Sequence, residues 1–287
     1  MRKYVIITPA RDEESHIEDT ILAVSQQTLR PTKWVIVDDG SADKTPEILD
    51  RAAAAYPWIT VVHRSNRGFR QAGGGVISAF KDGYACVEET DWDFVVKLDA
   101  DLSFSHDYFE RCFAEFDNDP LLGIGGGGIY HLVDGELKME ANPLFHVRGA
   151  TKIYKRECWD RLGGLLVAAG WDTVDEVKAN MLGWRTRTFP ELKVSHYRFT
   201  GAAYGTWKDS VKNGFANYVT GYHPLFMLFK CLKRLVARPY FVGSIALAWG
   251  FVSGYMSGAP QVRDRALIRY TRAQQLRRLF FLESIWK

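Results

Sequence analysis

Two pairs of acidic residues stand directly after short apolar runs and are the clearest candidates for chemistry in this sequence. Asp38 and Asp39 follow the run WVIV, and Asp99 and Asp101 follow the run FVVKL. Open α/β sheets bind ligands beyond the carboxyl ends of their strands. Clustered carboxylates repel one another unless a cation or the hydrogen-bond donors of a ligand offset their charge. An Asp-x-Asp pattern at a strand end therefore suits a hard divalent ion that also takes phosphate oxygens.

The runs that carry these acids alternate with helical patterns. We expect strands at Tyr4–Thr8, Trp34–Val37, Ile59–His63 and Phe94–Leu98. We expect helices over Glu13–Gln26, Thr45–Ala55, Ala72–Glu89 and His106–Phe116. Crossovers of this length are what parallel strands require. The first 120 residues are therefore expected to form a doubly wound, Rossmann-like half.

The pattern downstream is less regular. We expect a strand near Phe145–Tyr154, a helix over Thr173–Leu182, and two short strands at Arg185–Phe189 and Leu192–His196. The glycine runs at 73–75 and 125–128 lack the strand-turn-helix setting of a dinucleotide fingerprint, so we interpret both as close-packing or acceptor-side loops. The first strand is followed by TPARDEE instead of a Gly-rich loop, which argues against a nicotinamide-dependent oxidoreductase.

The motifs TPARDEE, VDDGS and KLDADLSF, in this order on the expected βαβ pattern, resemble those of the family 2 glycosyltransferases with the GT-A fold. The resemblance covers about residues 3–200. It implies an α/β fold in which helices flank a central, mostly parallel, Rossmann-like sheet. It also implies that the chain binds a nucleotide-sugar donor with Mn²⁺ or Mg²⁺.

The resemblance assigns candidate residues to the donor and the metal. The donor-binding residues it implies are Thr8, Pro9, Arg11, Asp38, Asp39, Arg70 and Asp99. The metal ligand it implies is Asp101, with Asp99 and His196 as further candidates.

A transferase that inverts the anomeric centre also needs a general base near the acceptor hydroxyl. The resemblance places Asp172 at the position of the family's catalytic Asp, although Trp171 stands where the family usually has Glu. Asp175 and Glu176 form an alternative acidic pair one helical turn later. A non-catalytic alternative also exists, because Asp172 and Glu176 are spaced like parts of a helix N-cap and capping box.

The Gln-x-x-Arg-Trp motif of the family's processive synthases is missing after Thr206, so we expect a single-addition enzyme. Trp171 and Trp207 suit stacking on acceptor sugars. The expected reaction moves one sugar from a nucleotide diphosphate-sugar, with a UDP-sugar favoured, to a lipid-linked or glycan acceptor. The alternatives are a polyprenyl-phosphate sugar synthase and a non-catalytic, nucleotide-binding scaffold of a polysaccharide assembly complex. No nucleic-acid partner is expected.

The C-terminal part of the chain is basic and apolar. Residues 207–287 hold 13 basic and 3 acidic residues, whereas residues 1–206 hold 24 and 31. The 24 residues between Arg238 and Arg263 carry no charge, and their basic flanks favour an in-plane or re-entrant element over a single span. We therefore expect an anionic membrane surface as the partner of residues 223–280. Small-residue steps at Gly250, Gly254 and Gly258 indicate a possible homo-oligomer contact.

These patterns predict a GT-A catalytic domain at 1–206 and a helical membrane-associating or oligomerisation region at 207–287. Within the catalytic domain, about 1–120 would bind the nucleotide-sugar and 121–206 the acceptor. The four cysteines are too dispersed for a zinc module or a disulfide scaffold. The N-terminal apolar run is too short for a signal peptide. We expect a cytoplasmic protein, peripheral or monotopic at the inner face of the cell membrane.

Overall fold

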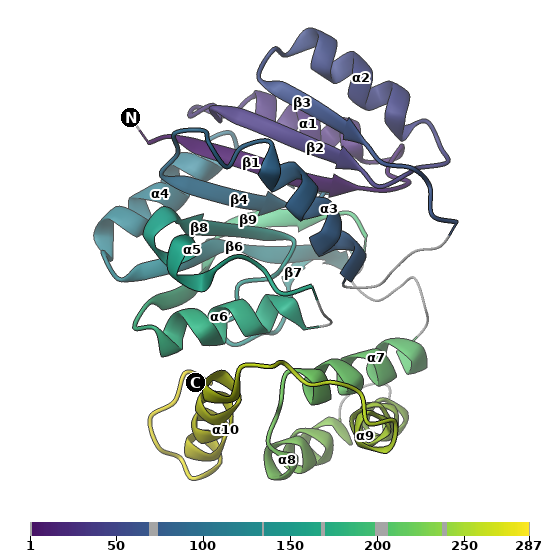
Figure 1. The fold of residues 1–287 in the computed structure, drawn as a ribbon, viewed down its shortest axis with the longest axis vertical. Coiled ribbons are helices and arrows are strands. Elements are labelled where there is room, and N and C mark those ends of the chain that lie inside the picture. The colour runs from purple at the N-terminus through teal and green to yellow at the C-terminus, as the bar shows by residue number, and fades with distance from the viewer. Residues whose placement is uncertain are drawn as a thin grey trace. The chain divides into compact units, whose positions relative to one another are not determined.

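The structure is a computed structural model that describes residues 2–68, 74–133, 135–167, 170–198, 206–236 and 240–286. Contacts divide the chain into two compact units (Figure 1). Unit 1 comprises Met1–Val167 and Leu182–Arg198, and unit 2 comprises Ala168–Met181 and Phe199–Lys287. The helix that carries Asp172 therefore belongs to unit 2 with the C-terminal helices, whereas the sheet belongs to unit 1. The domain limits at residue 206 stay a prediction.

Among the described residues, unit 1 contains one nine-stranded sheet in the order β3-β2-β1-β4-β8-β6-β9-β5, with β7 beside β6. The strands are β1 (Tyr4–Ala10), β2 (Lys33–Asp38), β3 (Ile59–His63), β4 (Phe94–Leu98), β5 (Leu102–Phe104), β6 (Leu122–Val133), β7 (Glu136–Met139), β8 (Thr151–Lys155) and β9 (Arg185–His196). The helices are α1 (Ile17–Ser25), α2 (Thr45–Ala55), α3 (Gly74–Ala85), α4 (Tyr108–Asn118) and α5 (Arg156–Leu162).

The first four strands pair in parallel, as the βαβ rhythm predicts. Beyond β4 the sheet becomes mixed, because β8 pairs antiparallel with both β4 and β6, and β5 pairs antiparallel with β9. Parallel pairing returns between β6 and β9, so the sheet is parallel over its first four strands and mixed beyond them. Hairpin and loop connections, such as those on either side of β7, permit antiparallel pairing.

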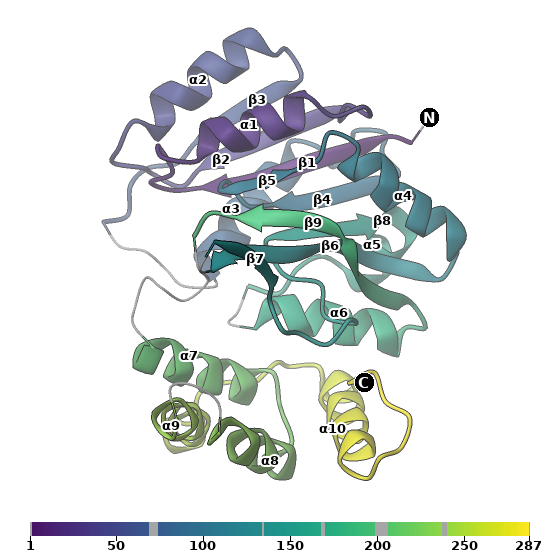
Figure 2. The same cartoon turned by 180° about the vertical axis from the view of Figure 1, so that it is seen from behind.

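Helices cover both faces of this sheet. One face carries α3 and α5 (Figure 1). The opposite face packs against α1, α2 and α4, whose apolar side chains join those of alternate strand residues in the main core (Figure 2). Residues such as Tyr4, Ile6 and Phe113 are buried there. With both faces covered, the central strands are fully buried and read as continuous apolar runs in the sequence.

The glycine run at 125–128 is part of strand β6, so it is not a loop, but the close packing expected of it is present. A Cβ on Gly126 would lie 2.4 Å from the carbonyl oxygen of Thr151, and a Cβ on Gly127 would lie 2.3 Å from that of Leu192. Glycine is needed because neighbouring backbone approaches too closely for any side chain. The pairing of β6 with β9 also shifts register between Gly127 and Gly128. The two short strands expected at 185–189 and 192–196 are one strand, β9.

Unit 2 is helical in the part of it that the structure describes. Its helices are α6 (Trp171–Met181), α7 (Thr206–Val219), α8 (Pro224–Arg234), α9 (Val242–Met256) and α10 (Arg265–Leu279). Helix α9 packs on α7 and α8, and α10 packs on α6 and α8. Among the described helices, none has both the length and the apolar character of a membrane span.

The glycines of α9 serve contacts within the chain. A Cβ on Gly250 would lie 1.9 Å from the carbonyl oxygen of Val211 in α7, and one on Gly254 would lie 2.2 Å from the ring of Tyr218. The matching glycine of α7, Gly214, is equally close to the α9 backbone. Gly250 and Gly254 are thus already in contact with α7 of the same chain, and the homo-oligomer contact expected through Gly250, Gly254 and Gly258 stays a prediction without support from these two residues. Small residues favour close helix approach wherever the partner helix comes from.

Candidate active site

The two acids of the Asp-x-Asp pattern lie between β4 and β5, at the expected strand end. Asp99 follows β4, and Asp101 directly precedes β5. The antiparallel pairing of β5 with β9 sets Leu102 opposite His196, which brings the imidazole Nε2 to 3.2 Å from Oδ2 of Asp101. One ligand atom from each of Asp99, Asp101 and His196 lies within 4.8 Å of the others. Two carboxylates and one imidazole are a donor set that fits Mn²⁺, or Mg²⁺ with more water.

Lysine and arginine side chains form ion pairs with these acids. Lys97 is buried on β4 and donates to Asp99 and, at 2.5 Å, to the carbonyl oxygen of Gly149. Arg198 donates to Asp101 at 3.2 Å and also pairs with Glu13. The acids are thus held in place by internal ion pairs, which orders them for a ligand.

The local charges shift the pKa values of this cluster. Burial raises the pKa of Asp99, and the neighbouring Asp101 adds to the rise, although Lys97 opposes it. Burial alone would lower the pKa of His196, but the hydrogen bond and charge of Asp101 outweigh burial and raise it. The raised pKa of Asp99 thus reflects mainly its burial, and that of His196 reflects the nearby carboxylates.

The second acid pair lies at the end of β2. Asp39 is bound by two guanidinium groups, from Arg64 at 2.6 Å and from Arg67. Asp38 accepts the backbone N–H of Ser41 at 2.9 Å and lies 3.1 Å from Nδ1 of His63. Arg64 and Arg67 are not among the predicted donor residues, although both lie in the segment that follows β3. The sequence does contain a signal for both arginines, because they follow an expected strand, Ile59–His63, just as Asp39 follows another.

Glycine shapes this corner as well. Gly40 has a φ of +74°, and a Cβ there would lie 2.5 Å from Cα of Asn66. The turn after β2 therefore packs directly on the segment that supplies the two arginines. Arg11, from the loop after β1, donates to the side chain of Asn66 at 3.2 Å. Three strand-end loops thus meet at one edge, as the sheet topology predicts.

One of the candidate donor residues does not face this edge as expected. The side chain of Thr8 is fully buried, and its hydroxyl accepts a hydrogen bond from Nε1 of Trp34 at 2.9 Å, so it faces the core. Arg70 lies outside the described residues. Pro9 is half-buried at the end of β1.

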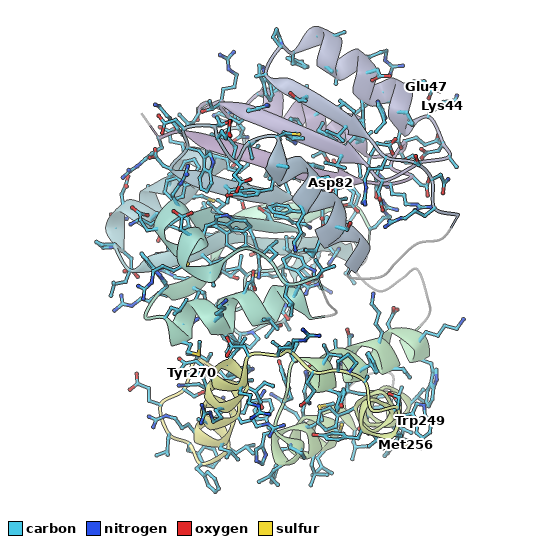
Figure 3. The ribbon with its side chains drawn as sticks, in the orientation of Figure 1. Lys44, Glu47, Asp82, Trp249, Met256 and Tyr270 are labelled. Atoms are coloured by element: carbon cyan, nitrogen blue, oxygen red, sulfur yellow. The ribbon has the colours of Figure 1, made fainter. Side chains whose placement is uncertain are left out.

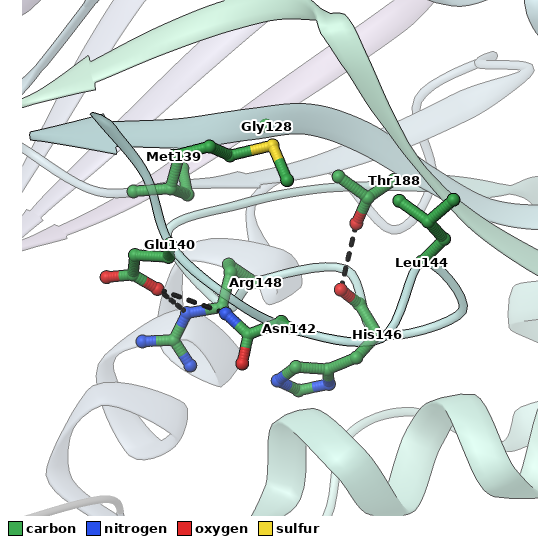
Figure 4. A pocket seen from close by; sticks show the side chains of 9 residues that line it. Gly128, Met139, Glu140, Asn142, Leu144, His146, Arg148 and Thr188 are labelled. Carbon is green, nitrogen blue, oxygen red and sulfur yellow. Dashed lines mark hydrogen bonds and ion pairs between the residues drawn. The ribbon is translucent and has the colours of Figure 1, made fainter. Parts of the chain in front are cut away.

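A partly buried polar network extends from His196 of the candidate metal site toward the loop after β7. Nδ1 of His131 lies 3.2 Å from the carbonyl oxygen of His196, and its Nε2 lies 2.8 Å from Glu140. Glu140 also pairs with Arg148 at 2.5 Å. Glu140 and Arg148 line a small pocket with Asn142 and other residues of the segment 139–148 (Figure 4).

The candidate base helix α6 belongs to unit 2. Asp172 is the second residue of α6 and is half-buried, whereas Asp175 and Glu176 are buried. The helix begins one residue before Asp172, so this residue does not occupy the N-cap position of the non-catalytic alternative. Tyr222 is buried near α6, and burial, with the charges of Asp172 and Glu176, raises its pKa.

The two tryptophans of the expected acceptor side differ in exposure. Trp171 is buried, which leaves little of its ring for a sugar. Trp207, in the first turn of α7, exposes 46% of its surface. Of the two, Trp207 therefore has the accessible ring that stacking requires.

Comparisons with known proteins agree with the geometry. Residues 5–165, more than half of the chain, match the model of the glycosyl transferase family 2. The chain is 32% identical over 122 residues to the uncharacterized glycosyltransferase EpsJ of Bacillus subtilis, covering 42% of this chain and 33% of that one. It is 29% identical over 116 residues to the poly-beta-1,6-N-acetyl-D-glucosamine synthase of Staphylococcus aureus, covering 40% and 26%. The chain thus matches a third or less of the length of these relatives.

Solved structures share the fold. The mannosyltransferase PcManGT from Pyrobaculum calidifontis, in complex with GDP-Man and Mn²⁺, matches 95% of this chain and 80% of its own, with a TM-score of 0.57 and 19% identity. S. aureus TarS in complex with UDP-GlcNAc matches 96% and 81%, with a TM-score of 0.55 and 15% identity. Motifs, sheet topology and the family match all agree: the chain belongs to the glycosyl transferase family 2.

Proposed function

We propose that this glycosyltransferase is an inverting, metal-dependent enzyme that transfers one sugar from a UDP-sugar to a lipid-linked or glycan acceptor. The observation that carries the proposal is the convergence at one sheet edge of the Asp99, Asp101 and His196 cluster with the arginine-bound Asp39. One group suits a metal-bound diphosphate, and the other suits the base and ribose of a nucleotide.

Each part of the donor has a matching group in unit 1. Asp39, with Asp38 beside it, accepts hydrogen bonds from the nucleoside. Arg64, a partly buried guanidinium, and its neighbour Arg67 lie within reach of the same carboxylate and can also take phosphate oxygens. Asp101, with help from Asp99 and His196, would hold Mn²⁺ or Mg²⁺, which would supply positive charge to stabilise the departing diphosphate.

The acceptor must lose a proton as it attacks. In the proposed step the acceptor oxygen forms a bond to the anomeric carbon, the bond from that carbon to the diphosphate oxygen breaks, and the hydroxyl proton passes to Asp172. The half-buried position of Asp172 supports this choice over Glu176, which is fully buried. Trp207 is proposed to stack on the acceptor.

A UDP-sugar is favoured over a GDP-sugar by the relatives. TarS is described in complexes with UDP and with UDP-GlcNAc, and another relative is named as a synthase of an N-acetylglucosamine polymer. PcManGT, described with GDP-Man, represents the other class.

We propose that residues 1–206 form the catalytic domain and that residues 223–280 hold the enzyme at the cytosolic face of a membrane, where a lipid-linked acceptor is presented.

Isothermal titration of the full chain with UDP or GDP, with and without Mn²⁺, tests the donor site. We expect UDP to bind only weakly without Mn²⁺, and we expect Asp101→Asn to remove the effect of the metal. Asp91→Asn, an exposed acid on the same unit, is the matched control and should behave like the unaltered protein. Equal UDP affinity of Asp101→Asn and the unaltered protein in Mn²⁺ would show that the metal assignment is wrong. Tighter binding of GDP would overturn the choice of donor.

A further inference from the structure

Helix α9 is apolar on both its packed and its exposed face: it buries small residues together with Leu247 and Phe251, and it exposes a further row of large apolar side chains. Gly243, Ala246, Gly250 and Gly254 are buried, and the last two pack on α7. The large apolar residues Val242, Ile245, Trp249, Val252 and Met256, spaced three and four apart, are all exposed. Trp249 and Met256 lie on the side of α9 away from α7 (Figure 3). A surface helix of a soluble protein has polar side chains on its exposed face, whereas the exposed face of α9 is apolar, as expected where lipid covers it.

The neighbouring helix α8 repeats the pattern. Its buried residues are Met227 and Cys231, and the carbonyl oxygen of Cys231 accepts a hydrogen bond from Ser244 of α9 at 2.7 Å. Its exposed apolar residues are Leu225, Leu228, Phe229 and Leu232. Together with the five outward residues of α9, these four define what we call the α8–α9 apolar face. So many half-exposed large side chains on two touching helices form more than the scattered apolar surface of an ordinary soluble protein.

The charge of unit 2 selects the occupant of this face. The exposed basic residues are Lys208, Lys212, Lys230, Lys233, Arg263, Arg265, Arg269, Arg277 and Arg278. Within 206–236 and 240–286, the one exposed acid is Glu283. Two copies of so basic a surface would repel each other, whereas anionic lipid headgroups would attract it. Trp249 and Tyr255 are also exposed on α9, and aromatic side chains of this kind concentrate at membrane–water interfaces.

We infer that the α8–α9 apolar face inserts into the interfacial layer of an anionic membrane, with α9 lying in the membrane plane. Such insertion would be the physical basis of the membrane association proposed above. The inference rests on that proposed function only for the role of the contact, because the contact itself follows from residues of unit 2 alone. Insertion makes binding depend on apolar area as well as on charge. The attachment is therefore expected to resist salt, unlike attachment by a basic tail alone.

Sedimentation of the full chain with vesicles tests the inference. The vesicles are phosphatidylcholine alone, or phosphatidylcholine with about one third phosphatidylglycerol, at low salt and at about 0.5 M salt. The informative variant is Ile245→Gln with Trp249→Gln, whose side chains are 57% and 53% exposed, so the fold should tolerate the change. Leu22→Gln is the matched control, because Leu22 is 52% exposed on α1 of unit 1.

We expect binding to the anionic vesicles that persists at high salt, and a partition coefficient reduced roughly tenfold or more by the double substitution but unchanged by the control. Equal binding of the double variant and the unaltered chain would overturn the inference, as would loss of all binding at high salt. A double variant that elutes as a smaller species in size exclusion would instead assign the face to a second copy. UDP titration of the same samples separates the two proposals, since the double variant should keep its UDP affinity. If the unaltered chain does not bind UDP, the proposed donor site is wrong, whereas the membrane inference is unaffected.

Discussion

Replacing Gly250 by alanine tests the close approach of α7 and α9. The new Cβ would lie 1.9 Å from the carbonyl oxygen of Val211 and 3.0 Å from the backbone nitrogen of Phe215. Even a tight contact of this kind needs about 3.0–3.4 Å, so the two backbones must separate locally by roughly 1 Å or more. Backbone cannot turn aside as a flexible side chain can, and the separation therefore spreads along the helix pair.

The cost of this separation can be estimated. A radial gap of about 0.5–1 Å forfeits roughly a quarter to a half of the dispersion attraction between facing atoms. Leu247 and Phe251 are buried beside Gly250, and burial of each stabilises the fold by about 1.5–3 kcal/mol. Losing that share at both residues, together with overpacking at the Cβ, costs about 2–5 kcal/mol. The higher helix propensity of alanine returns about 1 kcal/mol, so we expect a net loss of about 1–4 kcal/mol in the free energy of unfolding.

Urea unfolding followed by circular dichroism measures this loss. Ser253→Ala is the control, because Ser253 is half-buried one turn along and its hydroxyl bonds only within the helix, to Gly250 at 2.8 Å. The control should change stability by less than about 0.5 kcal/mol. If Gly250→Ala were as stable as the unaltered chain but changed its oligomeric state, the glycine would serve an intermolecular contact and our assignment to α7 would be refuted.

Three further predictions concern the site and its surroundings. Asp172→Asn should reduce turnover by roughly 10²–10⁴-fold while leaving the UDP affinity from titration unchanged; a loss below about tenfold would indicate an acceptor that is already an anion, such as a polyprenyl phosphate. The pKa of His63 is raised, first by its hydrogen bond to Asp38. Its contribution to the free energy of unfolding is therefore fully present below about pH 6.5 and is lost as the pH rises through the folded-state pKa. Urea midpoints of His63→Gln should therefore fall short of the unaltered chain at about pH 5.5 and match it at about pH 9, with a difference under about 1 kcal/mol because the side chain is 41% exposed. Arg64→Met should weaken UDP binding and cost about 1–3 kcal/mol of stability in urea, because it removes a partly buried partner of Asp39; unchanged values for both would remove Arg64 from the donor site.

The N-terminal half of the fold could be predicted because its signals are local. Each of the first four strands is a short apolar run, and each is followed by a helix long enough for a parallel crossover. The second half has weaker local signals, since β6 is built partly of glycine and glycine disfavours strands on propensity alone. Its glycines are explained only by what touches them, such as the carbonyl oxygen of Thr151 beside Gly126. A single sequence does not contain that information.

The same division applies to the site. Asp38, Asp39, Asp99 and Asp101 could be placed because they follow strands directly. The partners of these acids could not be chosen in the same way, because tertiary pairing supplies them. His196 reaches Asp101 through the register of β5 with β9, a strand pair separated by some ninety residues.

The internal cations around the Asp-x-Asp pattern lead to a prediction about how metal and nucleotide bind together. Lys97 bonds to Asp99, and Arg198 bonds to Asp101. A lone divalent cation between these acids would lie close to two positive groups, which disfavours it. A diphosphate brings negative oxygens that attract Lys97 and Arg198 and frees the carboxylates for the ion.

Mn²⁺ and UDP should therefore bind cooperatively, with each raising the affinity for the other by the same factor, within the usual range of roughly 5–150-fold. Titration of Mn²⁺ into the full chain, with and without saturating UDP, measures this factor directly. Arg198→Gln should raise the affinity for Mn²⁺ alone and reduce the coupling, because it removes one of the opposing charges. If Mn²⁺ binds as tightly without UDP as with it, the arginine and lysine do not oppose the ion, and the carboxylates alone determine its affinity.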